Sequence, residues 1–431
     1  MRKIISALFA SLLLVRGTAA LAGEHAATPL SLQQAIDTAL QGNTQYRLAA
    51  AAADAARAQV TQARAGFFPG LALQYSYTYQ DVVSELVTPF GTLPFAPNAT
   101  DVPLATLQYT VYDGGLSVAR FGEASAGFAA AQSAERAARS AVEMQTSKAY
   151  FDLIAAMRGA EVADRAVQLA QDHTKLSQER FDAGMVPRAD LITAQTDLAS
   201  QQTQAIAAHN AVALAQSALD SVMNVPLDML HTPTESLSAG ANTIALQNLI
   251  ATALRSRPEL AAATNAVGAA NLAVKAAAAG KLPHVNLMLS EGNAQPVLMT
   301  GYHNQFTLGL QAVWRLFDGG YSNGAIAGAR ASLVQAQLQL AALRTNIELA
   351  VRQAYANYTS AQAQVDAAQH LVTLADENQR LAEIRYRGGV GTSIELRDAE
   401  QRDVAANQQL ISAKVGLRES LVGLRYAAGL L

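Results

Sequence analysis

The 431-residue chain contains no cysteine, so it forms no disulfide bond and offers no thiol for lipid attachment at its N-terminus. Proline is absent from residues 104–186 and from every position after residue 296. Because proline interrupts a helix by removing a backbone hydrogen bond, these two stretches permit very long helices. No stretch reaches the roughly 18 consecutive apolar residues of a membrane-spanning helix, so we expect no transmembrane helix in the mature protein.

The first 22 residues have the three parts of a secretory signal peptide. Arg2 and Lys3 give a positive start, residues 4–15 form a short apolar stretch, and Ala20-Leu21-Ala22 supplies small residues at the cleavage point. We therefore expect residues 1–22 to be removed during export in a Gram-negative bacterium. At this stage a secreted soluble protein is the alternative.

The charge balance argues against a nucleic-acid partner. Removal of Arg2, Lys3 and Arg16 from the 31 basic residues leaves 28 of them against 34 acidic residues, a net charge of −6. A nucleic-acid-binding protein is expected to carry a clustered positive face instead.

The sequence repeats itself at a shift of 205 positions. Tyr112-Asp113-Gly114-Gly115 recurs as Phe317-Asp318-Gly319-Gly320, and the register holds without a gap from residue 112 to beyond residue 195. Upstream of residue 69 the shift becomes 214, so the first copy has nine more residues than the second between Pro69 and Tyr112. Such self-similarity indicates a duplicated structural unit.

We divide the mature chain into a first repeat, 23–225, an equatorial linker, 226–245, and a second repeat, 246–431. The expected helices cover 32–66, 116–182 and 189–223 in the first repeat and 246–279, 321–386 and 393–427 in the second. The helix over 116–182 would be roughly 100 Å long at 1.5 Å per residue. Two short helices laid end to end are about as long as one long helix. The second short helix of one repeat could thus continue into the first short helix of the next.

Four segments between the helices alternate apolar and polar residues, which is typical of strands with one apolar face. The expected strands cover about residues 70–80 and 104–113 in the first repeat and 283–291 and 304–317 in the second. About ten residues is the length of a tilted strand that crosses an outer membrane. A soluble sheet packed on the helices is the alternative. Four strands are too few to close a barrel, which needs about eight, so a membrane location requires an oligomer.

Several motifs carry a resemblance to a known family. They are Arg257-Pro258-Glu259-Leu260, the segment from Trp314 to Gly320, the segment from Arg385 to Gly391, and the weaker first copy of the latter from Arg180 to Gly184. Together, in order and in duplicate, these motifs resemble those of the TolC-like outer-membrane efflux proteins. The resemblance covers nearly the whole mature chain.

The resemblance implies a mainly α protein with a membrane β-barrel. It implies a homotrimer in which each protomer gives four strands to a twelve-stranded barrel in the outer-membrane lipid. That barrel would be continuous with a long α-helical barrel in the periplasm, with the linker as a belt. It also implies a function as the passive exit duct of a tripartite efflux or type I secretion system. The partners would be a periplasmic adaptor protein and an inner-membrane transporter, and the cargo small molecules or polypeptides.

Two glycine-containing segments join each long helix to its return helix and are read locally as helix C-caps and tight turns. They consist of Gly184, Met185 and Val186 in the first repeat and of Gly388, Gly389, Val390 and Gly391 in the second. The resemblance implies that these turns form the periplasmic tip, where the hairpins of an adaptor dock.

Glu395 and Asp398 lie one helical turn apart, so both carboxylates face the same way. A solvated helix face is the plain interpretation of such a pair. The resemblance implies a pair of acids at the narrowest point of the pore, where a trimer would place acidic rings that favour cations. Asp190 is the first-repeat equivalent of Glu395. The sequence departs from the family pattern, because Glu replaces the expected Asp at 395 and Gly391 stands where some members have an arginine.

Trp314, the only tryptophan, lies near the end of the last expected strand, and Tyr109 and Tyr112 lie at the corresponding strand end of the first repeat. Membrane-interface girdles favour such residues, although plain packing explains them nearly as well. The Asp-Gly-Gly segments at 113–115 and 318–320 are expected to form the turns from strand to long helix.

No catalytic, cofactor-binding or metal-binding pattern is found. The seven histidines are scattered without metal-ligand spacing, and the glycines at 388–391 follow a helix rather than a strand, so they predict no phosphate site. We therefore expect a protein that is not an enzyme and needs no cofactor. The alternatives are a periplasmic adaptor protein, whose β-regions would be compact, and a structural coiled-coil protein, which would have no strands.

Overall fold

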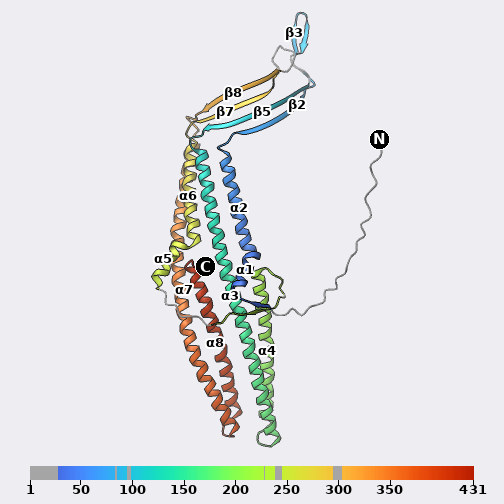
Figure 1. Ribbon diagram of the computed structural model, residues 1–431, viewed down its shortest axis with the longest axis vertical. Coiled ribbons are helices and arrows are strands. Elements are labelled where there is room, and N and C mark those ends of the chain that lie inside the picture. The colour runs from blue at the N-terminus through green and yellow to red at the C-terminus, as the bar shows by residue number, and fades with distance from the viewer. Residues whose placement is uncertain (1–27, 83–84, 95–98, 228, 238–244, 295–302) are drawn as a thin grey trace, which may run out of the picture.

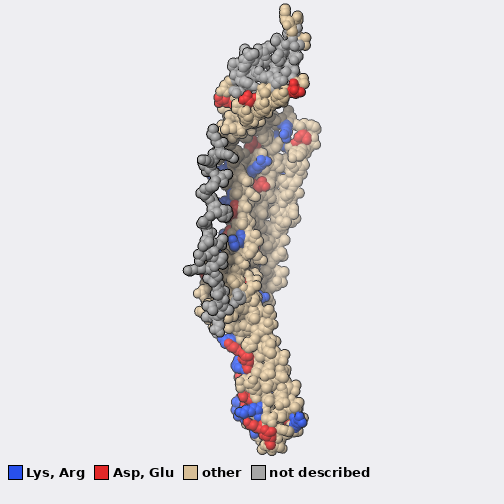
Figure 2. Space-filling view, turned by 90° about the vertical axis from the view of Figure 1, so that its right-hand side faces the viewer, with Lys and Arg blue, Asp and Glu red and all other residues tan. Residues whose placement is uncertain are grey.

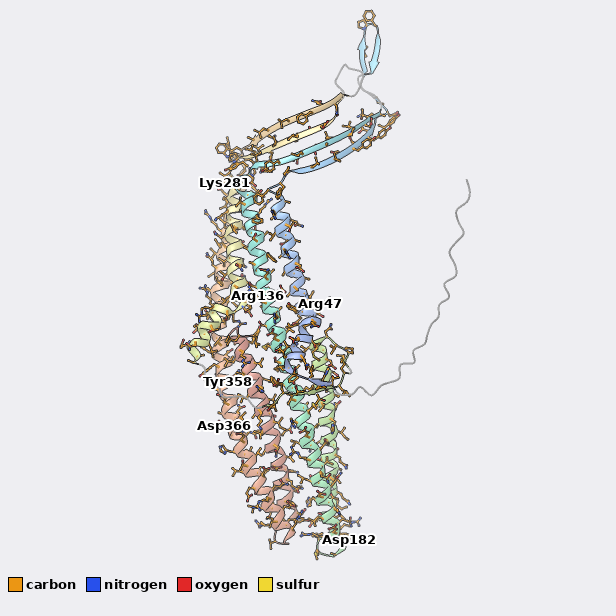
Figure 3. All side chains as sticks on the ribbon, in the orientation of Figure 1. Arg47, Arg136, Asp182, Lys281, Tyr358 and Asp366 are labelled. Atoms are coloured by element: carbon orange, nitrogen blue, oxygen red, sulfur yellow. The ribbon has the colours of Figure 1, made fainter. Side chains whose placement is uncertain are left out.

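The computed structural model describes residues 28–82, 85–94, 99–227, 229–237, 245–294 and 303–431. The expected signal peptide therefore lies outside the described residues. The molecule is long and narrow, with a sheet at one end and helices that run from it to the opposite end (Figure 1). Asp182 lies at the helical tip and Lys281 lies beside the sheet (Figure 3), so these two residues mark the opposite ends of the helical part.

Two helices of 67 residues run the whole length of the helical part. They are α3, Leu116–Asp182, and α7, Tyr321–Arg387. The return helices are α4, Arg188–Met223, and α8, Ser393–Ala427. These bounds lie within one residue of those expected from the sequence. Both copies therefore keep the same long-helix length, as the gap-free shift of 205 predicts.

The expected continuous helices over 32–66 and 246–279 were wrong, because each is two helices. The first is α1, Leu32–Gly42, followed by α2, Thr44–Ala65; the second is α5, Leu246–Ser256, followed by α6, Pro258–Ala279. Asn43 is extended, and its side chain accepts hydrogen bonds from the N–H groups of Gln45 and Tyr46, so it begins a new helix. Arg257 is extended because it precedes Pro258, whose ring disfavours helical backbone in the residue before it.

The helices pack in a row of four at every height. On the sheet side of the middle the order is α2, α3, α6, α7, and on the tip side it is α4, α3, α8, α7. The expected continuation of α4 into α5 and α6 was wrong, because α4 meets α1 and α2 of its own repeat instead. The Asn43 side chain donates to the carbonyl of Val222, and that of Asn224 donates to the carbonyl of Gly42. In the second repeat, α8 meets α5 and α6 through Arg257, which stacks on Tyr426.

Tyr150 of α3 anchors the segment that crosses the middle of the molecule. Its hydroxyl donates to the carbonyl of Leu30 at 2.8 Å and accepts from the N–H of Thr234 at 3.1 Å. These partners adjoin β1, Thr28–Leu30, and β6, His231–Pro233, which pair in parallel. Tyr150 is fully buried, so its hydroxyl depends on these partners for hydrogen bonds.

The sheet has four antiparallel strands in the order β2-β5-β7-β8. Their bounds are Gly70–Tyr79 for β2, Ala99–Tyr112 for β5, His284–Ala294 for β7 and His303–Val313 for β8. The strand expected over 304–317 ends at Val313, because the chain then bends toward the turn at Asp318. The region with the nine extra residues contains a separate hairpin of β3, Glu85–Thr88, and β4, Gly91–Pro94.

One face of the sheet is apolar from edge to edge. The register places Leu71 opposite Leu107, Leu107 opposite Leu289, and Leu289 opposite Leu308, so these four side chains share a face. Leu71 is 72% exposed and Leu308 is 62% exposed. The sheet projects beyond the ends of the helices (Figure 1). The alternative of a sheet whose apolar face packs on the helices is therefore wrong.

The opposite face of the sheet is polar. Thr106 lies opposite Ser290, and Ser290 lies opposite Thr307. Since cross-strand partners point to the same side, these hydroxyl groups form a row on that face.

The Asp-Gly-Gly segments form the expected turns from strand to long helix. The carboxylate of Asp113 accepts from the N–H groups of Gly115 at 3.0 Å and Ser117 at 2.7 Å, and Asp318 does the same for Gly320 and Ser322. Burial opposes ionisation of Asp113, but the hydrogen bonds from Ser117 outweigh it and lower the pKa of that carboxyl.

The geometry of the two turns predicts that a glycine-to-alanine substitution lowers the free energy of unfolding by different amounts in each. Gly114 and Gly319 have φ of +67° and +64°, but a Cβ on Gly114 would lie 2.6 Å from the Cβ of Leu282, whereas a Cβ on Gly319 meets nothing within 4 Å. Gly319→Ala should lower the free energy of unfolding by about 1 kcal/mol through backbone strain alone. Gly114→Ala should cost about 1–3 kcal/mol more through the clash. Thermal unfolding followed by circular dichroism measures both, and equal melting temperatures would contradict the prediction.

Candidate functional site

The two turns between long and return helices lie side by side at the end of the molecule farthest from the sheet (Figure 1). In the first, the N–H of Met185 donates to the carbonyl of Arg180 and that of Gly184 to Phe181. In the second, the N–H of Val390 donates to the carbonyl of Arg385, and that of Gly389 to Tyr386. Both are Schellman caps with a left-handed glycine, at φ +71° and +76°.

The tip turns present apolar side chains to solvent. Met185 is 75% exposed and Val390, its equivalent at a shift of 205, is 74% exposed. Gly184, Gly388 and Gly389 are also exposed, while Val186 and Gly391 are half-buried. The residues expected at the tip are therefore brought together there on two adjacent turns.

The acid pair lies in the first turns of α8, and each acid has an arginine beside it. The backbone N–H of Glu395 donates to the hydroxyl oxygen of the N-cap residue Thr392, and the Glu395 carboxylate lies 3.8 Å from the guanidinium of Arg385. Asp398 lies 3.4 Å from the guanidinium of Arg397. Both side chains are about half exposed, so these ion pairs are screened and weak.

The two arginines were not singled out from the sequence. Arg385 belongs to the motif that ends the long helix, and Arg397 lies between the two acids. Both residues could therefore have been noticed in the sequence as neighbours of the acid pair. Only the turn geometry shows that Arg385 reaches across it to Glu395. Asp190 lies in the first turn of α4, in the other hairpin, and it forms no ion pair with any of the described residues.

A contact between the two hairpins of the chain lies next to the turns. Tyr386 of α7 is 2% exposed and packs against α3. Its ring lies edge-on to His173 with centroids 5.5 Å apart, and its hydroxyl is 3.5 Å from that of Ser177. The guanidinium of Arg180 lies 4.4 Å from the ring centroid and donates to the carbonyl of Tyr386 at 2.7 Å. We call these four residues the inter-hairpin contact.

Buried acids of α8 continue from this contact toward the middle of the molecule. Burial raises the pKa of Glu400 to about 7, with Asp197 and Glu383 adding to the shift. Burial lowers the pKa of His173, whose Nδ1 lies 4.0 Å from the Glu400 carboxylate. Both shifts favour the neutral forms, and a pKa of about 7 leaves the Glu400 carboxyl about half protonated at neutral pH.

Two further acids of α8 face carboxylates of neighbouring helices. Burial and Asp376 of α7 raise the pKa of Asp403 to about 6. Burial and Asp152 of α3 raise the pKa of Glu419 to about 7. The packing of α8 therefore improves when protons are bound.

The aromatic residues expected at a membrane interface lie at the end of the sheet that joins the helices. The indole N–H of Trp314 donates to the carbonyl of Lys281 at 3.0 Å, while the ring stays 61% exposed. Tyr109 lies opposite Leu287 and Tyr112 opposite Val285, so both tyrosines are on the apolar face. These residues thus combine an exposed apolar body with a position near the junction of sheet and helices.

Charged side chains are unevenly distributed over the surface. Figure 2 shows a group of Lys, Arg, Asp and Glu side chains toward the helical tip and further charged side chains beside the sheet and along the helices on the face in view. None of the helices in the described part of the chain combines the length and apolar character needed to cross a membrane.

Comparison with known proteins gives one family. A family model described as "Outer membrane efflux protein" matches residues 35–225 and 249–430. Protein CyaE of Bordetella pertussis is 26% identical over 93% of this chain and 84% of its own length. The probable efflux pump outer membrane protein TtgC of Pseudomonas putida is 24% identical over 93% of this chain and 83% of its own length. A crystal structure of a membrane protein from Pseudomonas aeruginosa superposes with a TM-score of 0.81 at 21% identity, covering 92% of each chain.

The raised pKa of Glu400 predicts a pH-dependent stability. A carboxyl whose pKa rises from 4.5 to about 7 on folding stabilises the fold fully below about pH 4.5. It loses that contribution, on the order of 2–3 kcal/mol, as the pH rises through about 7. Glu400→Gln should therefore flatten the dependence of the melting temperature on pH between 5 and 8. The groups that act on Glu400 are His173 on α3, Asp197 on α4 and Glu383 on α7, while Arg397 of its own helix acts on His173.

Glu161→Gln is the control for this measurement, because Glu161 lies on the surface of α3 and its side chain is 53% exposed. It should leave the pH dependence of the melting temperature as in the parent chain. A Glu400→Gln protein that keeps the full dependence would show that this carboxyl does not cause it.

Proposed function

This chain belongs to the outer membrane efflux protein family and is an efflux or secretion channel of the Gram-negative outer membrane with a helical periplasmic part, and we propose that it works as a passive homotrimeric exit duct. The observation that carries the proposal is the four-stranded sheet, which exposes a continuous apolar face beyond the helix ends. Residues 1–22 would direct export as a signal peptide and be removed during it.

The edges of the sheet support assembly of three protomers. Strands β2 and β8 are the edge strands, and each is paired on one side only among the described residues. An unpaired edge cannot remain in lipid, because its backbone N–H and C=O groups would lack hydrogen bonds. β2 runs away from the helices and β8 runs toward them, so β8 of one protomer can pair antiparallel with β2 of the next. Three chains would thereby close a barrel of twelve strands, which we place in the outer membrane.

The row of helices has edges on the same two sides as the sheet. Helix α2 leads into β2, and α7 follows β8, so α7 of one protomer would pack on α2 and α4 of the next. These edges expose apolar side chains, among them Leu338 at 66% and Leu374 at 70% on α7 and Ile206 at 72% on α4. With four helices per protomer at each height, three protomers would form a tube of twelve helices across the periplasm.

The two faces of β2 provide a test of the proposed membrane location. Leu73 is 82% exposed on the apolar face, and Gln74 is its neighbour on the polar face. Leu73→Arg should cost about 2–4 kcal/mol per protomer if the apolar face meets lipid. It should reduce the amount of heat-resistant trimer recovered from the outer membrane.

Gln74→Arg is the matched control for Leu73→Arg. Its side chain would face the water-filled interior, and we expect it to assemble like the parent chain. Equal recovery of both variants would argue against lipid contact at this face. We assign Trp314, Tyr109 and Tyr112 to the periplasmic interface of the same barrel, since they lie at its helix-proximal end.

We place the closure of the duct at the helical tip, with Glu395, Asp398 and Asp190 as its acidic residues. In a trimer the acid pair would form two rings across the entrance, and carboxylate rings favour cations. The ion pairs with Arg385 and Arg397 reduce the negative charge of each ring without removing it, since both acids stay half exposed.

We assign adaptor docking to the exposed turns at the tip. The residues are Gly184, Met185, Val186, Gly388, Gly389, Val390 and Gly391. Exposed Met185 and Val390 offer apolar contact, and the glycines leave backbone accessible between them. An inner-membrane transporter would supply the energy through the adaptor, because the duct itself is proposed to be passive. The relative TtgC is described as the outer membrane protein of a probable efflux pump, which agrees with such a partner.

Removal of the acid pair should change conduction. Glu395→Ala combined with Asp398→Ala should lower the cation preference and raise the resting single-channel conductance in planar bilayers, because charge and bulk leave the entrance together. The matched control is Glu161→Ala with Asp164→Ala, which removes two exposed acids at the same spacing from α3, away from the tip. If the acid-pair variant and the parent conduct alike, these residues are not part of the gate.

A further inference from the structure

A cavity lies near the middle of the molecule, on the tip side, where α8 is flanked by α3 and α7. Its volume of about 570 Å³ is within the range of pockets that hold drug-sized molecules. Small residues of α8 form its floor, and side chains of α3 and α7 form its walls. The floor includes Gly416, Ser420 and Gly423, and the walls include Met144 and Lys148 of α3 and Asn357 of α7.

One carboxyl oxygen at this cavity lacks a hydrogen bond. Glu419 of α8 lines the cavity, its Oε1 is buried, and the described residues offer this atom no hydrogen-bond partner. Buried polar atoms in folded proteins nearly always have a partner, because they have lost their hydrogen bonds to water. A ligand that donates to this oxygen, or places positive charge beside it, would remove the cost of its burial.

The charges around Glu419 favour a cation over an anion. The charged groups that act on its carboxyl are Asp152 and Lys148, both of α3, and their opposite charges offset each other. From α7 the cavity receives the uncharged Asn357. Burial and Asp152 raise the pKa of Glu419 to about 7. The cavity therefore gains net negative charge as the pH rises through 7, and a bound cation would favour the ionised form of this carboxyl.

The cavity opens on the face of the helix row opposite to the segment that crosses the middle of the molecule. On α3, Tyr150 bonds to that segment, and Lys148 lies two residues away, about 200° around the helix. On α8, Arg418 donates to the carbonyl of Ser236 in the same segment, and Ser420 is again two residues away. Ser236 belongs to the linker expected as a belt. A belt lies outside the tube that it encircles, so in the proposed duct the cavity would open on the inner wall.

We propose that this cavity binds an amphipathic organic cation on the inner wall of the duct, with Glu419 as the residue that receives the cation. The apolar part of the ligand would pack on Met144 and over the glycines of the floor. The proposal rests on the proposed function for the direction in which the cavity faces, whereas binding itself can be measured on the isolated protein.

Only one copy of the repeat has the residues of this site. At a shift of 205, the counterparts of the two floor glycines are alanines of α4, and the counterpart of Glu419 is Leu214. Helix α4 therefore has neither the carboxyl nor the glycines, although it is the return helix of an equally long hairpin. The site is a specialisation of the second repeat.

Ethidium is the probe for this site, because it is a flat, largely apolar cation whose charge does not change with pH. Fluorescence anisotropy of ethidium, titrated with the full-length trimer in detergent, gives its dissociation constant. Glu419→Gln should weaken binding about tenfold, as expected for loss of a charged partner. Phenanthridine, the uncharged parent ring of ethidium, should bind to the parent protein at least about tenfold more weakly than ethidium for the same reason.

The pH dependence of binding separates a role in charge recognition from a structural one. With a pKa of about 7, the ionised fraction of Glu419 falls about tenfold between pH 8 and pH 6, and the affinity for ethidium should fall by about the same factor. Glu419→Gln should abolish this dependence. Glu161→Gln is the matched control, because Glu161 lies eleven residues, about three helical turns, from Tyr150 and thus on the opposite face of α3. It should bind ethidium like the parent at both pH values.

Gly423→Leu should block the cavity without harming the fold. A Cβ on Gly423 would meet nothing within 4 Å, so the leucine can extend into the cavity. Replacing a glycine inside a helix also favours the helix. We expect the affinity for ethidium to fall about tenfold or more through steric exclusion, while the melting temperature of the trimer is equal to or above that of the parent.

A planar bilayer tests the position of the cavity on the inner wall. Ethidium bound there adds positive charge to the wall, so it should lower the cation preference of the parent channel, measured as the reversal potential across a salt gradient. The same concentration of ethidium should leave the reversal potential of Gly423→Leu unchanged.

Four results would overturn the proposal. Equal affinity of Glu419→Gln and the parent would show that this carboxyl does not receive the cation. Equal binding of phenanthridine and ethidium would show an apolar cavity without charge recognition. Full affinity in Gly423→Leu would place ethidium elsewhere on the protein. Binding that leaves the reversal potential of the parent unchanged would show that the cavity is not on the inner wall.

Failure of the proposed function gives a different result. A parent protein that conducts no ions in planar bilayers would contradict the proposed duct, whereas the binding of ethidium and its dependence on Glu419 would be unaffected. The two failures are thus distinguishable.

Discussion

Every backbone N–H and C=O group of a strand in lipid must be hydrogen-bonded, and the sheet formed by the described residues has four strands. That constraint determines what the rest of the molecule has to provide. In the proposed trimer the two edge strands pair with other copies, so the helices attached to them would have to present matching edges. They do, because α2 and β2 lie on one side of the protomer and α7 and β8 on the other. The row of four helices repeats the order of the four strands, with one element of each at either edge.

The sequence predicted the regular part of this arrangement well. Two proline-free stretches and a shift of 205 without a gap were enough for the bounds of α3 and α8, because helix composition and periodicity are local properties. Strand alternation likewise predicted all four strands of the sheet. The breaks at Asn43 and Arg257 were missed because one amide side chain, or one proline, outweighs a run of good helix formers at a single position.

Side-chain partners at the tip could not be read from the sequence. The acid pair was visible through its spacing, but the arginines beside it depend on the path of the turn. The inter-hairpin contact joins Arg180 to Tyr386, and the repeat, which maps Arg180 onto Arg385, does not show that the two hairpins touch there. Burial of Glu400 next to His173 also depends on which helices meet, so the rise of its pKa to about 7 could not be predicted without the fold.

The sheet argues against the coiled-coil alternative. The adaptor alternative also fails, because its β-regions would be compact and this sheet stands apart from the helices.

The length of α3 and α7 has a mechanical consequence. Each extends roughly 50 Å from the middle of the molecule to the tip at 1.5 Å per residue. A tilt of only about 5° over that arm moves its end by roughly 4 Å, which is more than the 2.7 Å that separates Arg180 from the Tyr386 carbonyl. The joints at Asn43 and Arg257 interrupt only the shorter helices, whereas α3 and α7 run unbroken from the sheet to the tip, so a swing of the lower half has to bend these two helices. A rotation of a few degrees at mid-height, where Tyr150 holds the crossing segment, would therefore be enough to break the contact between Arg180 and Tyr386.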